Sequence, residues 1–248
     1  MNIAIFGLGY VGCISLGCLA QNGHNVIGVD VNTHKVSLVN QAKSTVIEKD
    51  IDEIIRRNFD LKRIQATTRS FEAVLQTDVA LICVGTPNDD TGKLNLEFVE
   101  KVAGEIGQAL REKDSFYTVL IRSTVPPGTN EKVAGIIEEG SGKQHCTDFA
   151  VVSNPEFLRE GSAVKDYYNP PYTVLGSYCE KGIEISRDIY GAIEAPFEIM
   201  EVRAAELLKY VNNSFHAMKI TFANEVGNIA KRLGIDSHKL MAVFSKDD

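Results

Sequence analysis

The glycine-rich segment GLGYVG, residues 7–12, constrains the fold of this chain more than any other feature. It follows an apolar stretch, 2–6, and opens an amphipathic one, which is the order of a strand, a tight turn and a helix. Gly7 permits the turn, Gly9 lets a pyrophosphate approach the backbone, and Gly12 lets the helix pack closely on the strand. The segment therefore predicts a helix N-terminus that binds the phosphates of a dinucleotide.

Asp30 supports the same interpretation. It ends a second apolar stretch, 26–29, about 20 residues after the glycines, where a carboxylate can accept hydrogen bonds from an adenosine ribose. A 2′-phosphate would be repelled there, so we expect NAD rather than NADP as the cofactor. Lys35 could lie along the rim of this pocket or could be a solvated lysine on a helix. The alternative interpretation of these residues is a glycine-rich turn that binds no ligand.

Composition favours a small-molecule partner. The chain has 248 residues, a net charge of −7 and no stretch in which Lys and Arg gather, so we expect no nucleic-acid surface. No window approaches the roughly 20 continuous apolar residues of a membrane span, and we expect a cytoplasmic protein without membrane association. The five cysteines lack metal-like spacing and give an odd count, which is typical of a reducing compartment. We expect no metal, and we interpret Cys13, Cys18 and Cys83 as small buried hydrophobic residues.

Predicted strands and helices alternate along residues 1–200. Besides the two strands already named, we predict strands at 79–84, 118–121, 149–153 and 172–175, and a helix at 96–111. This alternation is typical of an α/β fold with a Rossmann-type, doubly wound and mostly parallel sheet. Ligands of such sheets lie beyond the carboxyl ends of the strands. We therefore expect chemistry in the three motifs that follow strands, which are VGTP (84–87), RSTVPPGT (122–129) and SNPEFLREG (153–161).

From about residue 201 the pattern changes to one long helix, which Gly234 would end. A helix of about 45 Å, at 1.5 Å per residue, is too long to pack only on its own sheet. It should link two domains or form a dimer face. We predict that 201–248 begins a central helical domain and that the chain forms a homodimer through this helix from about residue 203.

The long helix carries polar residues on one face. Lys209, Asn213 and His216 are spaced four and three residues apart, so an ammonium, an amide and an imidazole lie on adjacent turns. Such a face could bind an oxygen-rich substrate, and the ammonium could stabilise negative charge on an alcohol oxygen as hydride leaves its carbon. A solvated lysine and a capped asparagine are the structural alternative.

Four further candidates each follow a predicted strand, and these are Thr86, Thr124, Glu156 and Glu160. A carboxylate in this position could relay a proton if partial burial or a neighbouring lysine tuned its pKa. Either glutamate could instead be a residue that stabilises the start of a helix through the helix dipole.

Together these motifs resemble the nucleotide-sugar 6-dehydrogenases, the UDP-glucose/GDP-mannose dehydrogenase family. GLGYVG, VGTP, RSTVPPGT, SNPEFLREG and the run KYVNNSFHAMKITFANE (209–225) occur in the family's order over essentially the whole chain. That run and the segment DYYNPPYTVLG (166–176) resemble the branch that oxidises GDP-mannose more than the branch that oxidises UDP-glucose. The resemblance implies polysaccharide biosynthesis, with oxidation of a sugar C6 alcohol to a carboxylate by two hydride transfers to two NAD molecules.

The resemblance also implies roles for particular residues. Contacts to NAD are implied for Gly7, Gly9, Tyr10, Val11, Gly12, Asp30, Lys35, Thr86 and Thr124. Contacts to the sugar nucleotide are implied for Glu160, Lys209, Asn213, His216 and Asn224. Glu156 resembles the family's acid/base glutamate, and Thr124 would help it to hold a water. Lys209 and Asn213 would stabilise the oxyanion.

The chain departs from the family at one decisive point. The family's second oxidation runs through a thioester on a cysteine in a GGSCLPKD-like motif, which lies a little beyond the position of Asp248. No cysteine of this chain stands in such a motif. We therefore expect the N-terminal part of such an enzyme, which binds NAD but is inactive alone. Two alternatives stay open: a one-step NAD-dependent dehydrogenase of the 3-hydroxyacid type, and a non-catalytic NAD-binding module whose helix pairs with another chain.

Overall fold

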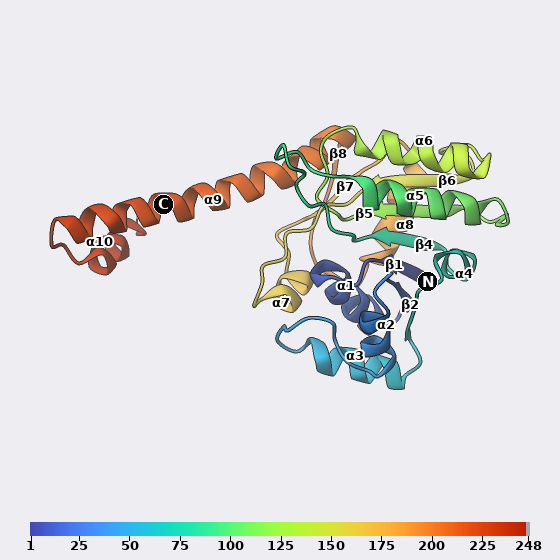
Figure 1. The fold of residues 1–248 in the computed structure, drawn as a ribbon, viewed down its shortest axis with the longest axis horizontal. Coiled ribbons are helices and arrows are strands. Elements are labelled where there is room, and N and C mark those ends of the chain that lie inside the picture. The colour runs from blue at the N-terminus through green and yellow to red at the C-terminus, as the bar shows by residue number, and fades with distance from the viewer. Residues whose placement is uncertain (247–248) are drawn as a thin grey trace. The chain divides into compact units, whose positions relative to one another are not determined.

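One mostly parallel sheet organises the first unit of the chain, Met1–Leu207 (Figure 1). The computed structural model describes residues 1–246. The strands are β1 (Asn2–Phe6), β2 (Asn25–Val29), β3 (Ile64–Thr67), β4 (Val79–Ile82), β5 (Tyr117–Ile121), β6 (Phe149–Ser153), β7 (Thr173–Gly176) and β8 (Phe197–Met200). The helices between them are α1 (Tyr10–Gln21), α2 (Thr33–Asn40), α3 (Ile51–Asp60), α4 (Ser70–Leu75), α5 (Glu97–Leu110), α6 (Thr129–Ser141), α7 (Ala163–Tyr168) and α8 (Glu180–Ile189).

The strand order confirms the predicted Rossmann-type α/β fold. The sheet runs β3-β2-β1-β4-β5-β6-β7-β8, and neighbouring strands from β3 to β6 are parallel. The chain builds outward from β1 in both directions, so the order reverses between β1 and β4. Ligands of doubly wound sheets bind at such a reversal. β7 is antiparallel to β6, and β8 is parallel to β7.

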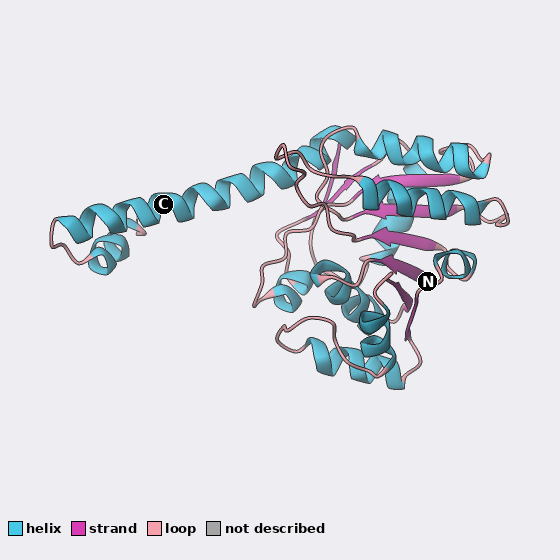
Figure 2. Cartoon of the chain, viewed as in Figure 1, coloured by secondary structure: helices cyan, strands magenta, loops and turns pink. Residues whose placement is uncertain are grey.

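Helices cover both faces of the sheet (Figure 2), and a hydrophobic core lies on each face. Successive residues of a strand point to opposite faces. Ile3 and Ile5 therefore pack in the core that contains buried residues of α1, α3, α7 and α8. Ala4 and Phe6 pack in the core that contains buried residues of α4, α5 and α6. Because both faces are covered, the central strands are apolar along their whole length, which is why the sequence shows them as continuous apolar runs.

Three details of the sheet differ from the sequence-based prediction. β3 and β8 were not predicted, because β3 is short and contains polar Gln65, and β8 is partly exposed with Glu198 at its centre. β4 ends at Ile82 and not at residue 84. Its partner β1 ends where the chain turns at Gly7, so β1 has no further residues that can pair with β4. The ends of β1, β2, β5 and β6 at the site are as predicted, and the end of β4 lies two residues earlier.

A second unit begins at Leu208, within the long helix α9 (Val202–Arg232). The helix has 31 residues and ends just before Gly234, whose φ of +67° is the left-handed conformation that stops a helix, as predicted. A short helix, α10 (Ser237–Phe244), follows, and the side chain of Asp236 caps its N-terminus. The last two positions of the predicted central domain, 247–248, lie outside the described residues. Among the described residues, no helix is both long enough and apolar enough to cross a membrane.

Candidate coenzyme and substrate site

Five parallel strands end level with one another and place the predicted motifs along one edge of the sheet. The last residues of β1, β2 and β4 are paired in register, as are those of β4, β5 and β6. The residues that follow these ends are the glycine segment 7–12, Asp30, Thr86, Thr124 and Glu156. Residues as far apart in sequence as Gly7 and Glu156 thus lie along the edge where such sheets bind ligands.

The three glycines of the first turn have different surroundings. Gly7 has a φ of +96°, and a Cβ there would lie 2.8 Å from the carbonyl oxygen of Cys83. A Cβ on Gly12 would lie 1.8 Å from the carbonyl oxygen of Gly7, so no side chain fits. A Cβ on Gly9 would meet no protein atom within 4 Å. Gly9 precedes the first residue of α1 and leaves open space there, which fits a coenzyme pyrophosphate.

Asp30 is fixed against this turn by two backbone hydrogen bonds. Its Oδ2 accepts the N–H of Leu8 at 2.7 Å, and its Oδ1 accepts the N–H of Asn32 at 2.8 Å. The ammonium of Lys35 lies 3.6 Å from Oδ2, so this lysine is paired and is not the solitary solvated residue of the alternative interpretation. A carboxylate has about four lone-pair sites, so Asp30 keeps acceptor capacity for a ribose diol.

The loops after β4 and β5 are tied together by hydroxyl groups. The hydroxyl of Thr86 donates to the carbonyl oxygen of Thr124 at 2.9 Å. The hydroxyl of Ser123 donates to the carbonyl oxygen of Val84 at 2.6 Å. The predicted pair Thr86 and Thr124 is therefore in contact, and the two loops form one continuous wall of the site.

Glu156 lies in the loop after β6 and is 9% exposed. Its Oε2 accepts the N–H of Leu158 at 2.6 Å, which orients the carboxylate. Glu160, four residues later, is exposed. The structure thus gives Glu156 a buried and oriented carboxylate at this edge, and its acid/base role stays a prediction.

A buried arginine, Arg122, braces this loop and was missed by the sequence analysis. Its Nη1 donates to Oδ1 of Asn154 at 2.8 Å and to the hydroxyl of Tyr190 at 2.9 Å. Burial alone would lower the pKa of Arg122, but electrostatic interactions with Tyr190, Cys83 and Glu156 raise it above its usual value. A fixed positive charge therefore lies near Glu156. The signal was available, because Arg122 directly follows a fully buried strand.

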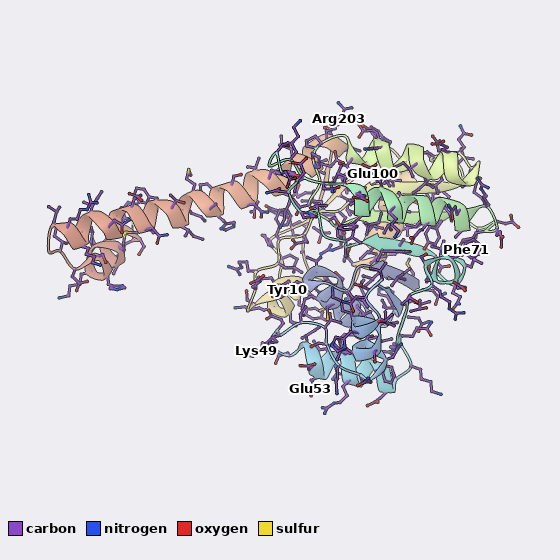
Figure 3. The ribbon with its side chains drawn as sticks, viewed as in Figure 1. Tyr10, Lys49, Glu53, Phe71, Glu100 and Arg203 are labelled. Atoms are coloured by element: carbon purple, nitrogen blue, oxygen red, sulfur yellow. A yellow bond between two sulfur atoms is a disulfide. The ribbon has the colours of Figure 1, made fainter. Side chains whose placement is uncertain are left out.

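Glu48 is a second residue that sequence reasoning missed. The hydroxyl of Tyr10, labelled in Figure 3, donates to Oε2 of Glu48, and the N–H of Gly161 donates to the same oxygen at 2.8 Å. Burial, followed by the hydrogen bond to Glu48, raises the pKa of Tyr10. Glu48 joins the start of α1 to the end of the SNPEFLREG segment. No local pattern could reveal it, because these partners are 38 and 113 residues away.

The remaining predicted residues lie on α9, in the second unit. Lys209 is buried, whereas Asn213, His216 and Asn224 are exposed. The helix is continuous across all four, so the predicted spacing of Lys209, Asn213 and His216 holds. Their contact with a sugar nucleotide stays a prediction.

The cysteines agree with the prediction in part. Cys13, Cys18 and Cys83 are buried, and burial raises the pKa of Cys18 and Cys83 to about 12. Cys146 and Cys179, however, form a disulfide. The expectation of reduced cysteines is therefore wrong for this pair. It could not be anticipated, because the two residues are 33 positions apart and meet only when β7 folds back on β6.

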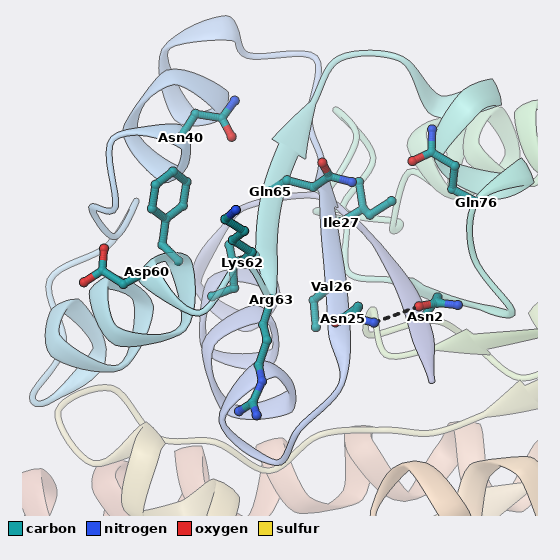
Figure 4. A pocket seen from close by; sticks show the side chains of 12 residues that line it. Asn2, Asn25, Val26, Ile27, Asn40, Asp60, Lys62, Arg63, Gln65 and Gln76 are labelled. Carbon is teal, nitrogen blue, oxygen red and sulfur yellow. Dashed lines mark hydrogen bonds between the residues drawn. The ribbon is translucent and has the colours of Figure 1, made fainter.

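A hollow of about 760 Å³ lies at the opposite edge of the sheet, near the first residues of β1, β2 and β3 (Figure 4). Its lining includes the hydrogen-bonded pair Asn2 and Asn25, with Asn40 and Gln65 nearby. None of the predicted site residues contributes to it. The candidate site is therefore the edge where the five parallel strands end, and not this hollow.

Comparison with family models agrees with this geometry. The model described as the UDP-glucose/GDP-mannose dehydrogenase family, NAD binding domain, matches residues 1–194. The model of the central domain of the same family matches residues 203–248. These matches confirm the predicted resemblance and NAD as the cofactor.

Individual relatives give the same result. The chain is 47% identical over 248 residues to the GDP-mannose 6-dehydrogenase of Pseudomonas aeruginosa, with 100% of this chain and 57% of that protein covered. It is 34% identical over 253 residues to a UDP-glucose 6-dehydrogenase of Haloferax volcanii, of which it covers 58%. The chain thus spans somewhat more than half the length of these curated relatives.

Solved structures match as well. A ternary complex of GDP-mannose dehydrogenase from Pseudomonas aeruginosa superposes with a TM-score of 0.97, over 100% of this chain and 57% of that one. A 3-hydroxyisobutyrate dehydrogenase of Mycobacterium tuberculosis reaches a TM-score of 0.67 at 17% identity, over 99% of this chain and 70% of that one, which shows a shared fold alone.

Proposed function

Because the chain belongs to the UDP-glucose/GDP-mannose dehydrogenase family, we propose that it serves the NAD-dependent oxidation of the C6 alcohol of a nucleotide sugar. The preferred reaction is GDP-mannose to GDP-mannuronate, and UDP-glucose to UDP-glucuronate is next. The observation that carries the proposal is the common edge of five strands, where Gly9, Asp30, Thr124 and Glu156 meet. The 47% identity to a GDP-mannose 6-dehydrogenase supports the choice of sugar nucleotide.

The residues at this edge fit NAD. Bound NAD would supply the hydride acceptor. The N–H groups at the start of α1 would receive its pyrophosphate above Gly9, and Asp30 would accept hydrogen bonds from the ribose hydroxyls. Lys35, Tyr10 and Val11 would line the adenosine side. Thr86 and Thr124, already joined by a hydrogen bond, would line the nicotinamide side.

Glu156 would relay a proton to or from a water that Thr124 helps to hold, since its carboxylate is buried and oriented by the N–H of Leu158. The ammonium of Lys209 and the amide of Asn213 would stabilise the oxyanion that forms as hydride leaves the sugar carbon. Lys209 and Asn213, with Glu160, would also bind the sugar nucleotide.

His216 and Asn224 would complete the sugar-nucleotide contacts from the same helix. We also propose a cytoplasmic homodimer that pairs through α9 from about residue 203, with domains at 1–200 and 201–248. Exposed Phe215, Met218 and Phe222 on α9 supply an apolar surface for such a pairing.

Isothermal titration calorimetry with NAD tests the coenzyme site. We expect saturable binding by residues 1–248, and about 10- to 150-fold weaker binding by Asp30→Ala, because hydrogen bonds to a charged group contribute about 1.5–3 kcal/mol. NADP should bind more weakly than NAD. Asp60→Ala is the matched control, since Asp60 is exposed at the opposite edge of the sheet and should leave affinity unchanged. Absence of heat with a folded protein would contradict the proposal.

A turnover assay tests whether residues 1–248 can complete the oxidation. The catalytic cysteine motif of the family is absent from these 248 residues, so we expect NAD binding without sustained NADH production from GDP-mannose. Steady release of two NADH per sugar nucleotide would refute this expectation. One NADH with a carbonyl product would instead support the one-step alternative. Binding of GDP-mannose and UDP-glucose, compared by competition, tests the order of preference.

A further inference from the structure

Three side chains outside the proposed coenzyme site form a compact cluster at the other end of β6. Cys146 lies in the turn before β6, and Cys179 directly precedes α8. The two are joined by a disulfide with a Cα–Cα distance of 5.1 Å. Nε2 of His145 lies 3.3 Å from Sγ of Cys179. The cluster therefore combines a disulfide with an imidazole in direct contact.

The two sulfurs differ in access to solvent. Cys146 is exposed, whereas Cys179 is 3% exposed. Cys146 also has a φ of +65°, a left-handed conformation that costs energy for a residue with a side chain, and its N–H donates to the carbonyl oxygen of Phe149. An external thiol can reach Cys146 only, so exchange with solvent must begin at that sulfur.

The surroundings of Cys179 favour a thiolate once the disulfide opens. Cys179 is the N-cap of α8, a helix of 10 residues, whose N-terminal dipole stabilises negative charge. Nε2 of His145 accepts the N–H of Val151 at 3.3 Å, so the ring proton is on Nδ1, and the same nitrogen lies 3.3 Å from Sγ of Cys179. Its one lone pair can take the thiol proton of Cys179 only in exchange for the hydrogen bond from Val151. Burial lowers the pKa of His145, which keeps the ring neutral and able to accept the thiol proton.

We propose that Cys146 and Cys179 form a redox-active pair that exchanges with low-molecular-weight thiols, with Cys146 as the exchanging sulfur and Cys179 as the buried resolving sulfur. In reduction, an external thiolate attacks Sγ of Cys146, and Cys179 leaves as a thiolate. A second external thiolate then attacks the external sulfur of the mixed disulfide, which releases Cys146 and an external disulfide. In balance, one protein disulfide and two thiols give one protein dithiol and one external disulfide. Oxidation follows the same steps in reverse.

The remaining cysteines provide an internal control. Cys13, Cys18 and Cys83 are buried, and burial raises the pKa of all three thiols. A thiol with a raised pKa that lies away from solvent reacts slowly. Cys179 is buried as well, so alkylation of the folded protein should report on the exposed Cys146.

Intact mass after alkylation, in buffers of graded reduced and oxidised glutathione, tests the proposal. We expect the folded wild type to gain one alkylated thiol, at the exposed Cys146, as the buffer becomes more reducing. With oxidised glutathione, Cys179→Ser should accumulate a mixed disulfide at Cys146, whereas Cys146→Ser should not. His145→Phe should slow closure of the disulfide by about tenfold at pH 7, because an unassisted thiol is only a few per cent thiolate there.

Three results would overturn the proposal. The first is a wild-type disulfide that resists reduced glutathione until the protein unfolds, since the pair would then be a structural cross-link. The second is equal glutathionylation of Cys146→Ser and Cys179→Ser. The third is stoichiometric zinc in the reduced protein that blocks reoxidation, measured by atomic absorption, since His145 and the two thiols would then be metal ligands. The wild-type measurements decide the matter even if a variant does not fold.

Discussion

The buried carboxylate of Glu206, in the first turns of α9, accepts a hydrogen bond from the backbone N–H of Asn130 at 2.7 Å. Its other oxygen accepts the N–H of Gly128, also at 2.7 Å. These N–H groups lie at the N-terminus of α6, where Gly128 belongs to the RSTVPPGT motif and Asn130 directly follows it. Nearby, Nε of Arg203 (Figure 3) donates to Oε1 of Glu131 on α6 at 2.9 Å. The start of α9 is thus fixed to the helix that follows one wall of the candidate site.

Glu206→Gln should lower the free energy of unfolding by about 1–3 kcal/mol. A glutamine offers one acceptor oxygen, and its amide donors would face an N–H that has lost its partner. Urea denaturation of the two proteins measures the difference. Glu198→Gln, on the exposed side of β8, is the control and should change stability by less than about 0.5 kcal/mol. Equal stability of the Glu206 variant and the wild type would show that these bonds contribute nothing.

Gly9 and Gly12 should separate coenzyme binding from folding. A Cβ on Gly9 meets no protein atom within 4 Å, so Gly9→Ala should cost less than about 1 kcal/mol of stability. It should nevertheless weaken NAD binding by about tenfold or more, because the methyl group would occupy the approach of the pyrophosphate. Gly12→Ala would place its Cβ 1.8 Å from the carbonyl oxygen of Gly7, and should cost about 3 kcal/mol or more. Thermal melting measures the stability of both variants, and calorimetry measures their affinity for NAD. Normal NAD binding by Gly9→Ala would contradict the prediction.

Tyr190→Phe tests the network around Arg122. The hydroxyl of Tyr190 donates to Oδ1 of Asn154 at 2.6 Å and accepts from Nη1 of Arg122 at 2.9 Å, and Tyr190 is 2% exposed. Its removal leaves a buried guanidinium with one partner fewer, so we expect a loss of about 1–3 kcal/mol in denaturant unfolding. Tyr168→Phe is the matched control. Its hydroxyl has only a marginal 3.4 Å contact to a backbone carbonyl, and a loss of similar size there would undermine the assignment to the network.

The parts of this structure that were predictable depend on local patterns. The glycine turn, Asp30 and the apolar central strands each follow from a few consecutive residues, because backbone geometry and burial on both faces of the sheet impose a fixed local pattern. The placement of Thr86, Thr124 and Glu156 at one edge follows in turn from the parallel sheet, since parallel strands end on the same side.

The parts that were missed depend on partners far apart in the chain. Glu48 acquires its role only because Tyr10 and Gly161 meet it, and Arg122 because Asn154 and Tyr190 surround it. The disulfide between Cys146 and Cys179 depends in the same way on the antiparallel return of β7. No spacing rule encodes such contacts, because tertiary packing creates them.

Asp166 should make stability depend on pH in the acid range. Its carboxylate accepts hydrogen bonds from Nη2 of Arg159 at 2.6 Å, from Nε at 3.1 Å and from the hydroxyl of Ser162 at 3.0 Å. The hydrogen bond from Arg159, opposed in part by burial, lowers the pKa of Asp166 below its ordinary value of 3.8. A carboxyl group whose pKa is lower in the folded state contributes stability that is fully present above its unfolded pKa and is lost as pH falls through its folded pKa.

Asp166→Asn removes this titration while it keeps the size of the side chain. We expect the variant to be less stable than the wild type at neutral pH by about 1–3 kcal/mol, because hydrogen bonds to the charged carboxylate are lost. The difference should shrink as the pH falls below the ordinary pKa of 3.8 and through the lowered pKa of folded Asp166, where the wild-type carboxylate takes up its proton. Urea denaturation across this range measures the difference, with Asp60→Asn, exposed at the end of α3, as the control. A difference that stays constant with pH would mean that the charge of Asp166 does not stabilise the SNPEFLREG segment, and that its hydrogen bonds act through geometry alone.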